Sequence, residues 1–218
     1  MHASLCSACA QCPQLGDREA PRHHGEWTAR VGMVSRDERR ILMSATDTTM
    51  KHLRIGDLTS RLPIVQGGMG VGVSLAGLAS AVASEGGIGV IASVGIGSHE
   101  PDLETHFLEA NLRVLKQEIR KARQKTDGIL GVNIMVALTD YAEHVKTAIA
   151  ENIDILFSGA GLPLNLPEYA TAGQRTKLVP IVSSGRAAEI ICRRWATRYG
   201  RLPDAVVVEG PLAGGHLG

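Results

Sequence analysis

A histidine near the end of the sequence lies in the pattern best suited to acid–base chemistry. His216 belongs to the run 211–218, Pro-Leu-Ala-Gly-Gly-His-Leu-Gly, which follows the apolar segment 205–208. Glycines let a backbone approach a ligand closely, or adopt a positive φ, without a clash at Cβ. A histidine held on such a loop can accept or release a proton near neutral pH. The pattern predicts a buried strand ending in a loop that presents His216 to a ligand.

Small and polar residues follow other apolar segments of the chain as well. Gly67, Gly68 and Met69 come after the segment 63–66, and Asn133 lies near the end of the segment 129–134. Small residues at the ends of adjacent strands leave room for a flat ligand whose heteroatoms backbone N–H groups can reach. Other interpretations stay open: the glycines could form a tight turn, Asn133 could satisfy backbone groups, and Met69 could fill the core.

Six short apolar segments recur along the chain and predict the strands that carry these residues. They lie at 63–66, 88–92, 129–134, 153–157, 178–182 and 205–208. Each segment is continuously apolar and not alternating, so both of its faces are expected to be buried, as in a parallel sheet. Helical patterns separate several of the segments. They lie at 74–84, 103–122, 141–149 and 187–195, and the first is alanine-rich and expected to be deeply packed.

The alternation of strands and helices is compatible with two α/β folds. A TIM-type (β/α)8 barrel and a doubly wound sheet both consist of such repeats. No Gly-x-Gly-x-x-Gly sequence with a downstream acidic residue follows the first segment, which disfavours the dinucleotide-binding sheet. We predict the barrel, of which about six βα units are present. Its active site would form at the C-terminal ends of the strands.

Composition and charge argue against several functional classes. The 218 residues carry a formal net charge of +1, which gives no sign of a nucleic-acid partner, and no segment has the length and apolarity of a membrane span. The four cysteines form no disulfide framework, so we expect a cytoplasmic protein. Four histidines stand in no chemical pattern and are predicted to lie on the surface. They are His52, His99, His106 and His144.

Residues 1–49 differ from the rest of the chain. They show no sustained helical or strand period and no apolar core of a secretory signal. Cys6, Cys9 and Cys12 are spaced as Cys-x-x-Cys-x-x-Cys and could bind zinc or an iron–sulfur cluster, but no second pair of ligands stands at a standard spacing. We therefore predict no metal site, a disordered or non-native leader over residues 1–49, and a folded part over residues 50–218.

The folded part resembles the FMN-dependent nitronate monooxygenase family, formerly called 2-nitropropane dioxygenases. The resemblance rests on four motifs in the family's order. They are Pro-Ile-Val-Gln-Gly-Gly-Met at 63–69, Gly-Val-Asn-Ile at 131–134, Gly-Ala-Gly at 159–161 and Ala-Gly-Gly-His-Leu-Gly at 213–218. The resemblance implies a TIM-type barrel that binds FMN at the strand ends. It also implies oxidation of alkyl nitronates by O₂ to a carbonyl compound and nitrite.

The same resemblance assigns roles to individual residues. The flavin-binding residues that it implies are Gly67, Gly68, Met69, Asn133, Ala213, Gly214 and Gly215. His216 would be the catalytic histidine, either as a base toward a neutral nitroalkane or, as imidazolium, as the electrostatic partner of an anionic nitronate. Both roles stay open. The expected partners are a small nitronate or nitroalkane and O₂, without nucleic acid or membrane, and the oligomeric state is left undetermined.

Two other hypotheses remain. FMN- and NAD(P)H-dependent enoyl-ACP reductases are similar in the barrel, the Gln-Gly-Gly-Met turn, the Gly-Val-Asn strand and the histidine loop, and they would need an acyl-carrier partner. The chain also shows only six apolar segments where a barrel has eight strands, and barrels usually bind phosphate after strands seven and eight. We therefore expect a C-terminally truncated chain that binds FMN weakly or not at all, and an inactive barrel fragment is the third hypothesis.

Overall fold

Five parallel strands form the sheet that organises residues 50–170 and 173–214, the part of the chain that the computed structural model describes. In sheet order they are β3 (Gly89–Ala92), β4 (Leu130–Met135), β5 (Ile155–Gly159), β6 (Lys177–Val182) and β7 (Val207–Val208). A parallel bridge from Val65 to Ile88 adds the segment before β3 to the same sheet. The predicted leader, residues 1–49, lies outside the described residues.

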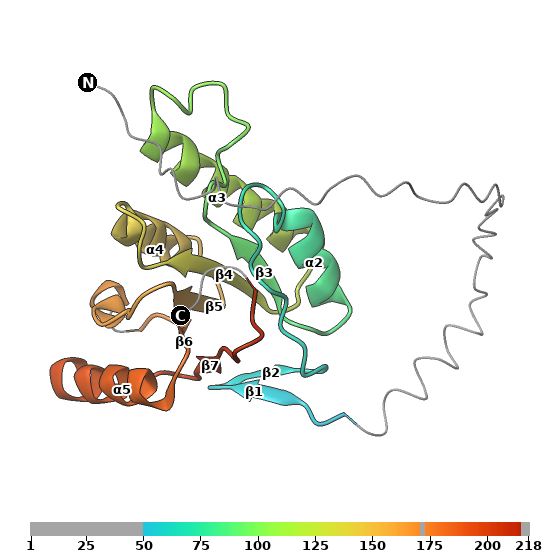
Figure 1. Ribbon diagram of the computed structural model, residues 1–218. Coiled ribbons are helices and arrows are strands. Elements are labelled where there is room, and N and C mark those ends of the chain that lie inside the picture. The colour runs from blue at the N-terminus through green and yellow to red at the C-terminus, as the bar shows by residue number, and fades with distance from the viewer. Residues whose placement is uncertain (1–49, 171–172, 215–218) are drawn as a thin grey trace, which may run out of the picture. The chain divides into compact units, whose positions relative to one another are not determined.

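Helices alternate with these strands along the chain. They are α2 (Ala76–Ser84), α3 (Phe107–Lys125), α4 (Tyr141–Ala150) and α5 (Gly185–Tyr199), with a short 3-10 helix, η2 (Leu166–Tyr169), between β5 and β6. Figure 1 shows α4 and α5 along one side of the strands. Sequential parallel neighbours joined through helices are the arrangement of a TIM-type barrel. The predicted α/β fold is therefore confirmed as part of such a barrel.

Alternate residues of each strand enter two separate cores. The core on the helix side includes Ile91, Leu156, Leu178 and the fully buried Trp195. The core on the other side of the sheet includes Val90, Phe157, Val179 and Ile55. Successive side chains of a strand point to opposite faces, so a strand buried on both faces must be continuously apolar. This is the physical basis of the apolar segments from which the strands were predicted.

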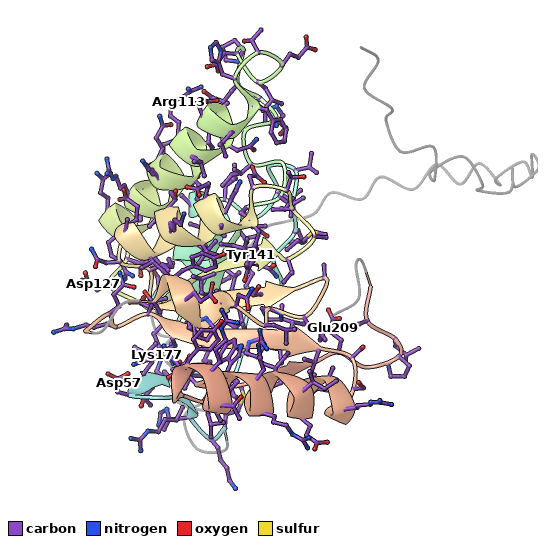
Figure 2. All side chains as sticks on the ribbon, turned by 90° about the vertical axis from the view of Figure 1, so that its left-hand side faces the viewer. Asp57, Arg113, Asp127, Tyr141, Lys177 and Glu209 are labelled. Carbon is purple, nitrogen blue, oxygen red and sulfur yellow. The ribbon has the colours of Figure 1, made fainter. Side chains whose placement is uncertain are left out.

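An N-terminal hairpin, which the sequence pattern did not indicate, packs against the core on the side of the sheet opposite the helices. It consists of β1 (Leu53–Ile55) and β2 (Leu58–Ser60), paired antiparallel around a turn in which Gly56 has a φ of +59°. Asp57 in this turn forms an ion pair with Lys177 of β6, and the hydrogen bond from Lys177 lowers the pKa of Asp57. Figure 2 shows Asp57 and Lys177 at one end of the sheet and Glu209 at the other.

Several predicted elements differ in detail from the structure, two of them in ways that bear on packing. The fourth strand was expected over 153–157 but occupies Ile155–Gly159, because Ile153 and Asp154 lead into the strand from the preceding turn. The helix expected over 74–84 begins at Ala76 and buries one face only, formed by Ala76, Ala79, Ser80 and Ala83. Its other face is exposed to solvent, including Gly77 and Leu78.

The prediction of four surface histidines is wrong for His144. His52, His99 and His106 are exposed, but the His144 side chain is only 2% exposed. It lies on α4, where Nε2 is 3.1 Å from Oδ2 of Asp140 and Nδ1 has no partner among the described residues. Burial lowers the pKa of His144, and the neighbouring Asp140 opposes this shift without cancelling it. The imidazole is therefore neutral in the folded chain at neutral pH.

We predict that His144 makes the chain less stable in mild acid. Below its ordinary pKa of about 6.5, the unfolded state binds a proton that the buried imidazole does not bind. The free energy of unfolding should therefore fall, by up to about 1.4 kcal/mol per pH unit, as the pH drops below this value. Urea unfolding at pH 7.5, 6.5 and 5.5 measures this dependence. The difference in stability between wild type and His144→Gln should shrink toward low pH, and a constant difference would contradict the prediction.

Candidate active site

A cavity of about 730 Å³ opens at the C-terminal ends of the parallel strands. This volume lies within the range of small-molecule and cofactor sites, about 300–1,000 Å³. The described residues that line it are Val65, Gln66, Gly67, Gly68, Met69, Gly70, Val71, Val90, Ala92, Val94, Asn133, Met135, Phe157, Gly159, Ala160, Ile181, Val207, Glu209 and Gly214. They come from loops and strands far apart in the sequence, so the cavity is a product of the sheet topology.

The structure brings together five of the predicted site residues. Gly67, Gly68, Met69, Asn133 and Gly214 all line this cavity. Ala213 does not line it; this residue is exposed, and its amide donates to the carbonyl of Gly210 at 3.0 Å. Gly215 and His216 lie outside the described residues. Each assigned role remains a prediction.

Asn133 presents an amide to the cavity that the described residues leave without a hydrogen bond. It lies on β4 between the buried Val132 and Ile134, which belong to the helix-side core. Its own side chain therefore points to the opposite face of the sheet, toward the cavity. Gly68 packs directly against it: a Cβ built on Gly68 would lie 2.6 Å from Cβ of Asn133 and 2.9 Å from Nδ2. A side-chain amide has donors and an acceptor for the edge of a polar ring.

Gln66 is a site residue to which the sequence reading assigned no role of its own. Its side chain pairs with the backbone of Val90 at both ends, donating from Nε2 to the carbonyl at 2.9 Å and accepting the amide at Oε1 at 3.2 Å. Both ends of the Gln66 side chain are hydrogen-bonded to the backbone of β3, so Gln66 holds the loop that follows it against the sheet. The side chain of Asn133 is then the amide that can contact a ligand. The motif contained Gln66, but only the fold identifies its partner.

Two turns at the rim of the cavity have unusual backbone conformations. Val71 has a φ of 52°, and Ala160 has a φ of 52° and is followed by Gly161 at 128°. A β-branched residue rarely adopts a positive φ, and such strain persists only where surrounding contacts impose it. For Val71 one such contact is the hydrogen bond from its amide to the carbonyl of Val94, at 2.8 Å.

The described cavity wall is largely apolar. Its polar side chains are Gln66, Asn133 and Glu209, and no Lys, Arg or His occurs among the lining residues that the structure describes. On the opposite, helix-facing side of β5, Ser158 forms a hydrogen bond of 2.9 Å with Tyr141, whose pKa burial raises. That pair contributes to packing and does not face the cavity.

A model of the nitronate monooxygenase family matches residues 51–218. The chain belongs to this family. The family consists of FMN-dependent flavoenzymes, so an FMN site is the expected use of a cavity at the strand ends.

Several individual proteins are similar to this chain. A curated Mycobacterium tuberculosis (strain ATCC 25618 / H37Rv) protein, (3aS,4S,5R,7aS)-5-hydroxy-7a-methyl-1-oxo-octahydro-1H-indene-4-carboxyl-CoA dehydrogenase, is 29% identical over 157 residues, which cover 72% of this chain and 38% of that protein. FabK from Thermotoga maritima is 33% identical with a TM-score of 0.54, covering 72% of this chain and 43% of FabK. Nitroalkane oxidase from Streptomyces ansochromogenes is 21% identical with a TM-score of 0.56, covering 73% and 49%, and shows the fold alone. The chain spans less than half the length of each.

The described residues fit the flavin ring of FMN better than its phosphate. Asn133 offers to a ring edge an amide that has no hydrogen-bond partner among the described residues, and the space beside it depends on Gly68 having no Cβ. Apolar walls from Val90, Phe157 and Ile181 suit a planar aromatic system. A phosphate is usually held by cationic side chains or by clustered backbone N–H groups, and the described lining contains no cationic side chain.

The described residues contain no helix with the length and apolarity needed to cross a membrane. Within the same ranges, no group of three or more His, Cys, Asp or Glu side chains is arranged to hold a metal ion. The cysteine motif at Cys6, Cys9 and Cys12 lies outside these ranges.

Proposed function

We propose that the protein is an FMN-dependent oxidoreductase that oxidises alkyl nitronates with O₂ to a carbonyl compound and nitrite. The observation that carries the proposal is the match of the nitronate monooxygenase family over residues 51–218. The cavity supports it, because motif residues from four separate segments line one space of suitable size. The proposed partners are a small nitronate or nitroalkane and O₂, and the proposed compartment is the cytoplasm.

The proposal gives the cavity residues distinct tasks. Gly67, Gly68, Met69 and Gly214 would form the close-packed wall of the flavin site, and the amide of Asn133 would donate to or accept from the ring edge. Bound FMN would supply the electron-transfer chemistry. The apolar walls would exclude water and strengthen each polar contact in the cavity.

His216, with Gly215 before it, completes the proposed site. The imidazole would either take a proton from a neutral nitroalkane or, when protonated, stabilise the charge of a nitronate. The two roles differ in pH dependence, because a base must be neutral and an electrostatic partner must be charged. Rate–pH profiles of wild type and His216→Ala with a neutral nitroalkane and with its nitronate distinguish them, and unchanged rates with both substrates would reject both roles.

A direct assay tests the reaction. The protein, incubated with FMN and an alkyl nitronate, should consume O₂ and release nitrite together with the carbonyl compound. Rapid NADH consumption with a crotonyl thioester, without nitrite release from nitronates, would overturn the proposal. Absence of any bound flavin after purification and after FMN addition would favour the inactive barrel fragment.

Reduction of an enoyl thioester is the second candidate. Two observations favour it: the curated relative is named for a carboxyl-CoA substrate, and FabK is more similar in sequence, at 33% identity, than nitroalkane oxidase at 21%. This function would require NAD(P)H and an acyl-carrier partner. The assay above separates the two candidates because only one of them consumes NAD(P)H.

We predict that riboflavin and FMN bind this chain with affinities within about threefold of each other. The phosphate of FMN would raise its affinity through a contact with a cationic side chain, and the described cavity wall contains no such side chain. Quenching of flavin fluorescence during titration measures both dissociation constants. Lumichrome, which lacks the ribityl chain, serves as the control for binding of the ring alone. An affinity for FMN more than tenfold above that for riboflavin would contradict the prediction.

A further inference from the structure

We infer that Ser74 is a positioning residue that holds the cavity loop Gly67–Met69 in place and so sets the contact between Gly68 and Asn133. Ser74 does not line the cavity; it lies just before α2 and is only 1% exposed. Its link to flavin binding rests on the proposed function, whereas its link to the loop rests on the contacts described below.

The hydroxyl of Ser74 uses its full hydrogen-bonding capacity on this loop. Oγ accepts from the amide of Met69 at 3.0 Å and from Nε2 of Gln66 at 3.2 Å, and it donates to the carbonyl of Gly67 at 3.3 Å. A serine hydroxyl has one donor and two acceptor sites, so all three are occupied. Alanine offers none of these bonds, whereas threonine retains a hydroxyl with the same one donor and two acceptor sites.

The backbone of Ser74 ties the same loop to the sheet. Its amide donates to the carbonyl of Met69 at 2.9 Å, and its carbonyl accepts from the amide of Ala92 at 3.0 Å. Ala92 is the last residue of β3 and lines the cavity. Ser74 therefore connects the loop to a strand end that is itself part of the site.

Apolar burial does little to hold this loop in position. Large apolar side chains in this loop and between it and Ser74 are exposed: Met69 is 49% exposed, Val71 64% and Val73 56%. Val71 also has a positive φ, which favours relaxation of the turn. A segment with few buried contacts opens locally unless hydrogen bonds hold it. The Ser74 hydroxyl supplies three such bonds from a buried position.

Ser74→Ala tests the inference with two measurements. Hydrogen–deuterium exchange of the Met69 amide, measured without flavin, should accelerate at least tenfold. The dissociation constant for riboflavin should rise about tenfold. Ser158→Ala is the matched control, because it also removes a buried, hydrogen-bonded hydroxyl but lies on the helix-facing side of β5. It should leave both quantities unchanged, and Ser74→Thr should restore both toward wild type.

The outcomes separate the positioning role from the proposed function. Unchanged exchange of the Met69 amide in Ser74→Ala, or equal acceleration in Ser158→Ala, would overturn the inference. Failure of Ser74→Thr to slow the exchange would also overturn it. If no variant, wild type included, binds riboflavin, the proposed function fails, while the exchange data still decide the role of Ser74.

Discussion

Gly89→Ala should strongly destabilise the described unit. Gly89 is the first residue of β3, and a Cβ built on it would lie 1.9 Å from the carbonyl oxygen of Ala79 and 2.6 Å from its carbonyl carbon. These are backbone atoms of α2, so no side-chain rotation can relieve the overlap. Helix and strand would have to separate, which would break the helix-side core around Ala76, Ala79 and Ala83.

We expect a loss of at least about 3 kcal/mol in the free energy of unfolding, the upper end of ordinary overpacking. For a domain of this size such a loss lowers the melting temperature by about 6–12 °C or more. Thermal unfolding followed by circular dichroism measures it, and aggregation on expression is the extreme form of the same result.

Gly77→Ala is the matched control in the same helix. Gly77 is exposed, and a Cβ built on it meets nothing within 4 Å. Replacing a glycine by alanine where the backbone conformation allows it stabilises by about 0.4–1 kcal/mol, because the unfolded chain has fewer conformations to lose. Gly77 is the second residue of α2, so this variant should melt at or above the wild-type temperature. Equal destabilisation by the two substitutions would mean that α2 does not pack on β3 as described.

The contrast between Gly89 and Gly77 shows where sequence reasoning ends. Both glycines lie among apolar residues, and the chain has 25 glycines. Which glycine lies against a neighbouring backbone depends on how α2 packs on β3, and no local pattern encodes that distance. The strands themselves were predictable because burial on both faces produces continuous apolar segments.

The hairpin and the cavity network illustrate the same limit. β1 and β2 have three residues each, too few for a periodic signal. Ser74 is the first residue of the alanine-rich segment 74–84, whose pattern predicts a helix and gives Ser74 no further role. His144 stands in no chemical pattern, so the sequence predicts a surface position for it. In each case the deciding fact is a contact between segments distant in sequence. The motifs predicted which loops meet at the cavity, and the fold shows which side chains hold them there.

Gly68→Ala should weaken flavin binding strongly while leaving the fold intact. A Cβ on Gly68 would lie 2.6 Å from Cβ of Asn133, an atom fixed by the central strand β4, and 2.9 Å from Cγ. The loop Gly67–Met69 would have to move away from β4, or the side-chain amide of Asn133 would have to rotate. Overpacking of this kind costs about 1–3 kcal/mol, which corresponds to about 5-fold to 150-fold in affinity if the cost appears only in the bound state.

Titration with riboflavin measures the affinity, and thermal unfolding measures the fold. Gly67→Ala is the control: it stiffens the same loop by the same loss of backbone freedom, but a Cβ on Gly67 meets nothing within 4 Å. We expect it to bind riboflavin more tightly than Gly68→Ala does. If the two variants lose affinity equally, the loss does not depend on the contact between Gly68 and Asn133. If neither loses affinity, the Gly68–Asn133 contact does not shape the flavin site. A loss confined to Gly68→Ala makes the missing Cβ of Gly68 the condition for a correctly placed Asn133 amide.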